Sequence, residues 1–224
     1  MNILQNIQSA FIDINEGENG FIHISDIIEN TQKFEKVFDM NFDLDYDINK
    51  VDIRKVENAD ISQYLKLDQP VLVQVLKEPI GSKGARLTSN ISIAGRYLVL
   101  LPNTAHRGVS RKIEGKQARD RLKRLIRAFE MPQNMGLICR TESAHATTEM
   151  LIDEANELLK IWLGIIDRFN ATDKPICLHE ESDFVKKTVD YAIQKKYDRL
   201  LVDHYATFQK CKLIAEKYVD EHPM

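Results

Sequence analysis

Residues 71–113 read VLVQVLKEPIGSKGARLTSNISIAGRYLVLLPNTAHRGVSRKI and join two kinds of sequence. Residues 71–77 alternate as a strand, residues 85–92 can form their partner, and the glycine-flanked turn between them carries Lys83 at its tip. A further strand is predicted at residues 97–101. The stretch therefore predicts β-structure on both sides of a junction, and the remaining segments take their place relative to it.

A β-hairpin is predicted ahead of the junction. Residues 7–14 and 21–24 are strand-like, and the NEGENG run between them has the composition of a turn. Alternate residues of a strand share a face, so Phe21 projects with His23, and Phe11 lies on the face opposite its immediate neighbours. Phenylalanines in such positions either pack in the core or stack on nucleic-acid bases, and the pattern leaves both readings open.

Charge is distributed unevenly along the 224 residues, although the formal net charge is only -3. Residues 1–70 hold 6 Lys and Arg against 14 Asp and Glu, residues 71–150 hold 14 against 6, and residues 151–224 hold 11 against 14. A basic block between acidic flanks suits phosphate binding, because each cation that neutralises a phosphate releases counterions. A solvated basic surface without a ligand is the alternative.

The chain carries no targeting or redox signal. Cys139, Cys177 and Cys211 are far apart and lack CxxC spacing, so we expect reduced, buried thiols. The N-terminus lacks a basic region followed by an apolar core, and no apolar run approaches the roughly 18 residues of a membrane span. We therefore expect a cytoplasmic protein without a membrane span.

Helical periodicity dominates the rest of the chain. A helix of about thirteen residues is predicted between strands at 97–101 and 135–140, and a longer helix at 148–167. The apolar face of the first comprises Ala118, Leu122, Leu125, Ile126 and Phe129, and that of the second comprises Leu151, Ala155, Leu158, Trp162 and Ile165. The later elements are expected as strands at 175–178 and 199–202 and helices at 182–195 and 206–219, which together predict a parallel sheet covered by helices.

Two groups of polar residues imitate metal sites. The close aspartates within residues 30–68 lack the glycine and glutamate spacing of an EF-hand, so that segment is expected to be an elaborated loop. His179 with Glu180, and Asp203 with His204, follow the two expected C-terminal strands, but no four-ligand spacing is present. We therefore predict no metal site.

The junction resembles the ribonuclease E/G family, whose members carry a KEPIGxKGARLTxxISxxGRYLVLxPN run followed by GxSR. The string SAFIDINEGENGFIHISDI is also similar to the central strands of that family's S1 domain, a β-barrel of the OB class. The resemblance implies an α+β chain with an OB-like S1 β-barrel at residues 1–92, an α/β 5′-sensor region at 93–147 and a partial RNase H-like α/β subdomain at 148–224.

The resemblance also implies two groups of site residues. The S1 group, expected to contact single-stranded RNA, comprises Phe11, Phe21, His23 and Lys83. The 5′-monophosphate group comprises the phosphate-contacting Arg140 and Thr141, the supporting Arg111 and the pocket-lining Gly95 and Val99. A guanidinium suits the phosphate role because its planar fork can grip two oxygens.

One position departs from the family pattern. Many relatives continue with RTA, whereas this chain has Glu142, which would share a face with Arg140 if the strand persisted. The following SAHA run indicates that the chain has already turned into a loop. We therefore expect Glu142 to point away from the phosphate.

In this family, hydrolysis belongs to a further domain with paired aspartates that hold magnesium in an IVID…TEALxxIDxN context, followed by a CPxCxG zinc segment that links subunits. Neither motif occurs in these 224 residues. Metal-assisted hydrolysis needs carboxylates to hold the cation. The resemblance thus implies the RNA-binding, 5′-sensing part of an endoribonuclease, inactive alone and without a cofactor; magnesium, zinc and homo-oligomer assembly are expected of the full enzyme. A free-standing, non-catalytic RNA-binding module is the alternative.

Overall fold

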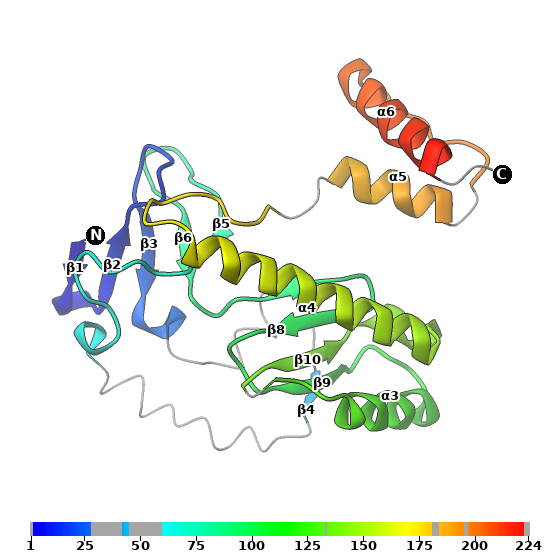
Figure 1. The fold of residues 1–224 in the computed structure, drawn as a ribbon, viewed down its shortest axis with the longest axis horizontal. Helices are drawn as coiled ribbons and strands as arrows, with labels where there is room; N and C mark the ends of the chain where they lie inside the picture. The colour runs from blue at the N-terminus through cyan, green and yellow to red at the C-terminus, as the bar shows by residue number, and fades with distance from the viewer. Residues whose placement is uncertain are drawn as a thin grey trace. The chain divides into compact units, whose positions relative to one another are not determined.

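The computed structural model describes residues 2–27, 42–44, 60–132, 134–180, 184–194 and 197–221, which form an α+β structure with two mixed sheets and four helices (Figure 1). The chain divides into two units, residues 1–178 and 179–224. Both sheets belong to the first unit, together with helices α3 and α4. The described part of the second unit contains helices α5 and α6. Most of the expected elaborated loop at 30–68 lies outside the described residues.

The first sheet has the strand order β1-β2-β3-β6-β5. Its strands are β1 (Asn2–Leu4), β2 (Ser9–Ile12), β3 (Gly20–His23), β5 (Gln74–Lys77) and β6 (Arg86–Thr88). The predicted hairpin is confirmed as β2 and β3, which pair antiparallel with Phe11 opposite Phe21. Its turn contains Gly17 at φ 81°, a left-handed conformation that costs glycine little.

The expected closed barrel is not formed by the described residues. Closure requires the two edge strands of a sheet to pair with each other. Here β1 and β5 lie at opposite ends of the strand order, and the pairing of β5 with β6 shifts register between Val75 and Lys77. The first sheet is therefore open, and one of its faces packs on a core of Ala10, Ile12, Ile22, Ile24, Ile61, Leu65, Ala85 and Leu87.

The second sheet has the order β4-β9-β10-β8-β7. Its strands are β4 (Phe42–Leu44), β7 (Ile93–Ala94), β8 (Leu98–Leu101), β9 (Arg107–Ser110) and β10 (Gly136–Cys139). Strands β9 and β10 run parallel because helix α3 (Lys116–Ala128) connects them, whereas the other pairs are antiparallel. The predicted strands at 97–101 and 135–140 and the thirteen-residue helix between them are confirmed.

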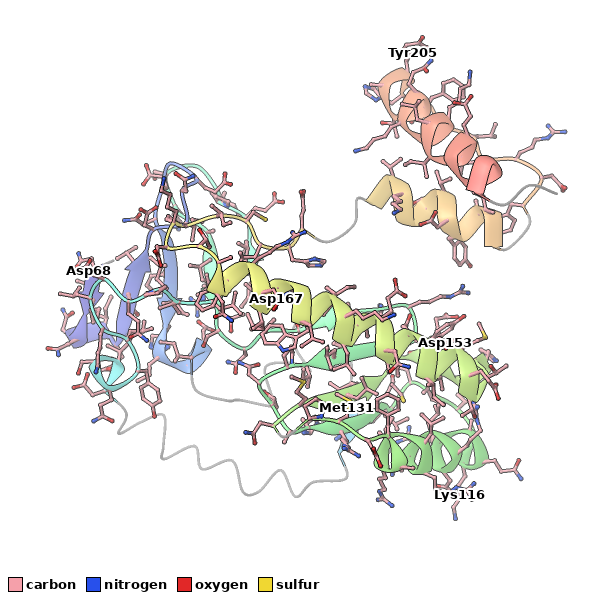
Figure 2. All side chains as sticks on the ribbon, viewed as in Figure 1. Asp68, Lys116, Met131, Asp153, Asp167 and Tyr205 are labelled. Carbon is pink, nitrogen blue, oxygen red and sulfur yellow. The ribbon has the colours of Figure 1, made fainter. Side chains whose placement is uncertain are left out.

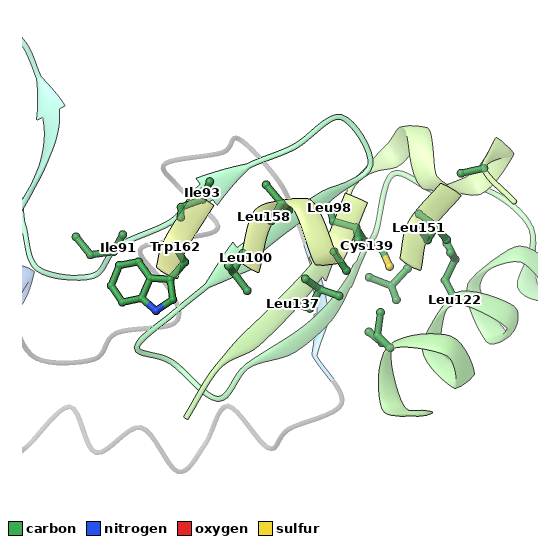
Figure 3. Packing of buried hydrophobic residues seen from close by; sticks show 14 of the residues in the cluster. Ile91, Ile93, Leu98, Leu100, Leu122, Leu137, Cys139, Leu151, Leu158 and Trp162 are labelled. Carbon is green, nitrogen blue, oxygen red and sulfur yellow. The ribbon is translucent and has the colours of Figure 1, made fainter. Parts of the chain in front are cut away.

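Helices α3 and α4 (Thr148–Asn170) both pack on one face of this sheet (Figure 3). The five residues predicted for the buried stripe of the longer helix are the ones that are buried in α4: Leu151, Ala155, Leu158, Trp162 and Ile165. They meet Leu98, Leu100, Leu137 and Cys139 from the strands, and Leu122 and Ile126 from α3. Burial raises the pKa of the Cys139 thiol to about 12, so this thiol stays protonated.

The C-terminal strands were predicted wrongly. Residues 175–178 and 199–202 form no strand, and the two helices there, α5 (Phe184–Gln194) and α6 (Tyr205–Glu221), pack against each other. A four-residue apolar run becomes a strand only where a neighbour completes its hydrogen-bond ladder. The described residues supply no such neighbour, and Leu201 remains 91% exposed. The expectation of three buried thiols is also wrong for Cys177, which is exposed.

Candidate functional sites

Two phenylalanines lie side by side on the face of the first sheet opposite its core. Phe11 and Phe21 are partners in the β2–β3 register, and their ring centroids are 5.7 Å apart in an edge-to-face arrangement. Both residues are half-buried, whereas their strand neighbours Ala10, Ile12 and Ile22 are buried in the core. The alternation therefore leaves an aromatic surface that is partly open to solvent.

An arginine that the sequence analysis missed completes this surface. The guanidinium carbon of Arg86 lies 5.0 Å from the centroid of the Phe21 ring, which is within cation–π range. The parallel pairing of β3 with β6 places Arg86 beside Phe21. The guanidinium also donates to the carboxylate of Asp26, whose side chain is only 3% exposed. Asp26 thus anchors Arg86 from the buried side and leaves its outer part available.

A cavity of about 730 Å³ lies over these side chains. The turn that follows β5 contributes Lys83, which is exposed, and Gly84. A Cβ on Gly84 would lie 1.9 Å from the carbonyl oxygen of Asn19, so only glycine lets this turn approach the β2–β3 turn so closely. The lining residues are Asn2, Phe11, Gly17, Glu18, Asn19, Phe21, Ser82, Lys83, Gly84 and Arg86.

Three of the four predicted S1 residues therefore meet at one cavity, and His23 stands apart. His23 shares the strand face of Phe21 by alternation but does not line the cavity. Its Nδ1 lies 2.8 Å from the hydroxyl of Ser25 and accepts the Ser25 backbone N–H. The His23 side chain therefore caps the N-terminus of the short 3-10 helix η2 (Ile24–Asp26).

The second candidate site lies at one edge of the second sheet. Because β9 and β10 are parallel, their carboxyl ends meet at the same edge, and the antiparallel β8 brings the β7–β8 turn there. Arg140 follows β10, its backbone N–H donates to Tyr97 at 2.7 Å, and its guanidinium donates to the Gly95 carbonyl. Three stretches far apart in sequence converge at this edge.

Thr141, the first residue of the 3-10 helix η5 (Thr141–His145), lies at the same edge. Its hydroxyl lies 3.4 Å from that of Ser110, the last residue of β9, and the exposed Arg111 follows directly. Thr141 is an exposed residue. Glu142 is exposed in η5, and the strand ends at Cys139 as the SAHA run predicted.

Val99 occupies a different environment from the other four residues of its group. It lies in β8, opposite Ile138 and Ala94 in the register, and is fully buried. Its neighbours Leu98 and Leu100 belong to the core under α4, so Val99 projects to the other face of the sheet. The structure thus brings Gly95, Arg111, Arg140 and Thr141 to the edge and places Val99 in the interior of the sheet.

Helix α3 supports the edge with arginines. Arg119 donates to the Ser110 carbonyl at 3.0 Å, and Arg121 donates to the carbonyls of Ser143, Ala144 and Ala146 in and after η5. These contacts fix the ends of β9 and η5. Three other cations of the helix are exposed: Lys116 at its start (Figure 2), Arg124 and Arg127.

Glu154 is a second residue that the sequence analysis missed. Its carboxylate, from α4, accepts the backbone N–H groups of Arg96 at 2.6 Å, Tyr97 at 2.8 Å and Leu98 at 2.7 Å. Burial raises the pKa of Glu154, against the opposing effects of these three N–H groups and of Arg140. Glu154 lies three residues after the buried Leu151, so it shares the apolar face of the helix, and a charged residue on that face is the sequence signal that could have identified it.

The structure offers no metal centre among the residues it describes, where no cluster of three His, Cys, Asp or Glu side chains occurs. His204 caps helix α6, with Nδ1 3.0 Å from the Thr207 hydroxyl. None of the described helices is long and apolar enough to span a membrane.

Comparison with known proteins gives relatives that are named ribonuclease E or ribonuclease G. Residues 92–224 match the ribonuclease E/G family. A ribonuclease E from Synechocystis is 34% identical over 212 residues, which cover 94% of this chain and 28% of the relative. A ribonuclease G from Salmonella typhimurium is 29% identical over 219 residues, which cover 98% of this chain and 42% of the relative. A ribonuclease E from Nostoc is 32% identical, again over 94% of this chain and 28% of the relative.

This chain therefore spans between 28% and 42% of the length of these relatives. The matched segments cover 94% and 98% of this chain. Because the family match alone covers more than half of the sequence, the chain belongs to the ribonuclease E/G family.

Proposed function

We propose that this chain is the RNA-binding, 5′-monophosphate-sensing portion of a ribonuclease E/G-type endoribonuclease that acts on single-stranded RNA in RNA processing and decay. The observation that carries the proposal is the convergence of Gly95, Arg111, Arg140 and Thr141 at one sheet edge. These residues come from three separate stretches, and three of them carry groups that recognise a terminal phosphate: two guanidiniums and a hydroxyl.

The cavity over the first sheet supports the binding of single-stranded RNA, as an S1-like surface would. Phe11 and Phe21 offer ring surfaces on which bases can stack, and stacking tolerates any base because every base has a π-face. Lys83 and Arg86 supply positive charge next to the rings. This combination of aromatic and cationic side chains suits a strand whose bases are unpaired.

The test is a comparison of binding to short single-stranded RNAs that differ only at the 5′ end. The purified chain should bind the 5′-monophosphorylated RNA more tightly than the 5′-hydroxyl RNA, by about tenfold or more, because one charge-assisted contact is worth that much. A 5′-capped RNA, whose bridging phosphates add negative charge at the 5′ end but leave no terminal monophosphate, controls for charge alone. Equal affinities for the monophosphate and hydroxyl ends would contradict the sensing role, and absence of RNA binding would contradict the proposal as a whole.

We assign hydrolysis to the part of the family enzyme that carries the paired aspartates, where magnesium and a linking zinc would be held. The chain carries neither the paired-aspartate nor the CPxCxG motif. We expect it to bind RNA without cutting it when incubated with 5′-monophosphorylated RNA and millimolar magnesium. Site-specific cleavage that survives purification and disappears in Asp203→Asn would instead place a catalytic centre in residues 179–224.

A further inference from the structure

The β7–β8 turn is held from outside by a single carboxylate. Three consecutive backbone N–H groups, those of Arg96, Tyr97 and Leu98, point at the two carboxylate oxygens of Glu154, at 2.6 to 2.8 Å. Successive N–H groups that converge in this way form an anion-binding concavity. In this protein the concavity is filled by a side chain of α4, 56 to 58 residues away in sequence.

This carboxylate explains why residue 95 is glycine. A Cβ built on Gly95 would lie 2.6 to 2.9 Å from the carboxylate atoms of Glu154. The φ of Gly95 is not in the left-handed range, so the backbone itself would accept alanine. Glu154 cannot move aside without losing its three N–H donors, and the requirement for glycine therefore comes from Glu154.

The same turn determines where the Arg140 guanidinium lies. The Gly95 carbonyl accepts from the guanidinium, and the Tyr97 carbonyl accepts from the Arg140 backbone N–H at 2.7 Å. A guanidinium bonded to a carbonyl on one side keeps its remaining donors oriented toward the other side. The hydrogen-bonded path from Glu154 to Arg140 therefore runs through two residues of one turn, Gly95 and Tyr97.

We propose that Glu154 is a positioning residue for recognition of the RNA 5′ phosphate: it fixes the Gly95–Leu98 turn, and through the Gly95 carbonyl it fixes the orientation of Arg140. The inference rests on the proposed 5′-sensing function. Glu154 does not contact the phosphate, because its carboxylate is already surrounded by the turn and would repel a second anion. Its role is to fix the turn, and phosphate recognition belongs to Arg140 and Thr141.

The test measures the ratio of affinities for 5′-monophosphorylated and 5′-hydroxyl RNA in Glu154→Ala and Glu154→Gln. Both variants should lose at least about tenfold of the wild-type ratio, because the turn is released and Arg140 loses its fixed acceptor. Affinity for the 5′-hydroxyl RNA should stay within about twofold of wild type, as expected for a change outside the stacking surface. Glu157→Ala is the matched control, since Glu157 is exposed on the same helix.

A purely structural role for Glu154 would lower affinity for both RNAs together, and that result would overturn the proposal. Retention of the wild-type ratio in both folded variants would also overturn it. If Glu154→Ala fails to fold, Glu154→Gln decides, since it keeps the side-chain volume and removes the charge. Loss of preference in Arg140→Ala with full preference in the Glu154 variants would reject the positioning role alone, whereas a wild-type chain without preference would reject the sensing function first.

A double-mutant cycle tests the clash directly. Gly95→Ala should lower the monophosphate preference in the wild-type background and have a much smaller effect when residue 154 is alanine, because the obstructing carboxylate is gone. Additive effects of the two substitutions would contradict the coupling between Gly95 and Glu154. Hydrogen exchange of the Arg96, Tyr97 and Leu98 amides should accelerate in Glu154→Ala, and unchanged exchange would show that the carboxylate does not hold the turn.

Discussion

The two sheets present their candidate ligand-binding groups in different ways. In the first sheet one face packs on a core and the other carries Phe11, Phe21 and Arg86, so binding groups project from the middle of strands. In the second sheet all residues of β8 and β10 are buried, so neither of these two strands offers an open face. Its binding groups leave from the strand ends instead. Burial on one face or on both thus decides whether a sheet recognises ligands with its surface or with its edge.

The largest effect of a single substitution on RNA binding is expected at the edge of the second sheet. Arg140→Ala should abolish the preference for a 5′ monophosphate over a 5′ hydroxyl, a change of about tenfold to hundredfold, because charge-assisted bonds to phosphate are lost. Binding to internal RNA should survive, as the first sheet is untouched. Fluorescence anisotropy with paired oligonucleotides measures both quantities.

The control for this substitution is Arg124→Ala, because Arg124 is exposed on α3 and its Nε donates to the backbone carbonyl of Asp120 in the same helix. It should leave the preference unchanged. An unaltered preference in Arg140→Ala would remove the edge of the second sheet from phosphate recognition.

A substitution on the open face of the first sheet should weaken binding to every single-stranded RNA, whatever its 5′ end. Phe21→Ala should weaken binding to single-stranded RNA by roughly 1 to 3 kcal/mol, or about fivefold to hundredfold, whatever the 5′ end, because one stacking surface is lost. Circular dichroism should show a folded protein, since Phe21 is only half-buried. Phe208→Ala controls for loss of a partly exposed phenylalanine elsewhere. If the Phe21→Ala protein were unfolded, the ring would belong to the core, and the first sheet would not bind RNA with its face.

The same contrast explains what could be read from the sequence. Periodicity predicted the β2–β3 hairpin, the face of Phe21 and the buried stripe of α4, because each depends on neighbours within one element. Arg140 and Thr141 are predicted site residues through family resemblance alone, since no local pattern marks a strand end as a site. Glu154 and Asp26 were missed because their partners lie 56 to 60 residues away. The strands expected at 175–178 and 199–202 failed because a strand needs a partner that local sequence cannot specify.

The stability of the second sheet should also decrease in acid. His106 lies in the loop before β9, at the opposite edge from Arg140, and is 5% exposed with no hydrogen-bond partner for Nε2 in the described residues. Burial lowers the pKa of His106 below its ordinary value of 6.5. As pH falls, His106 is therefore protonated in the unfolded chain at a higher pH than in the folded protein. The free energy of unfolding should decline below about pH 6.5 with a slope of up to about 1.4 kcal/mol per pH unit.

His106→Asn should remove this part of the slope, and urea unfolding at several pH values measures it. Above about pH 7.5 the group contributes no pH dependence, because it is neutral in both states. His145→Asn, an exposed position, is the matched control. A slope in His106→Asn equal to that of wild type would show that acid acts elsewhere in the molecule.

The smallest effect is expected at the tip of the turn between β5 and β6. Lys83 is exposed there and lines the cavity, but its contact with RNA would be a solvent-screened contact to one phosphate. Lys83→Ala should therefore weaken binding only a few-fold, equally for all RNA sequences and both 5′ ends, and should reduce the slope of log affinity against log salt by about 0.7. Phe21→Ala should leave that slope unchanged, since stacking releases no counterions. If Lys83→Ala altered the 5′-end preference while leaving the salt slope intact, the lysine would act on the edge site, and the separation of face and edge would have to be abandoned.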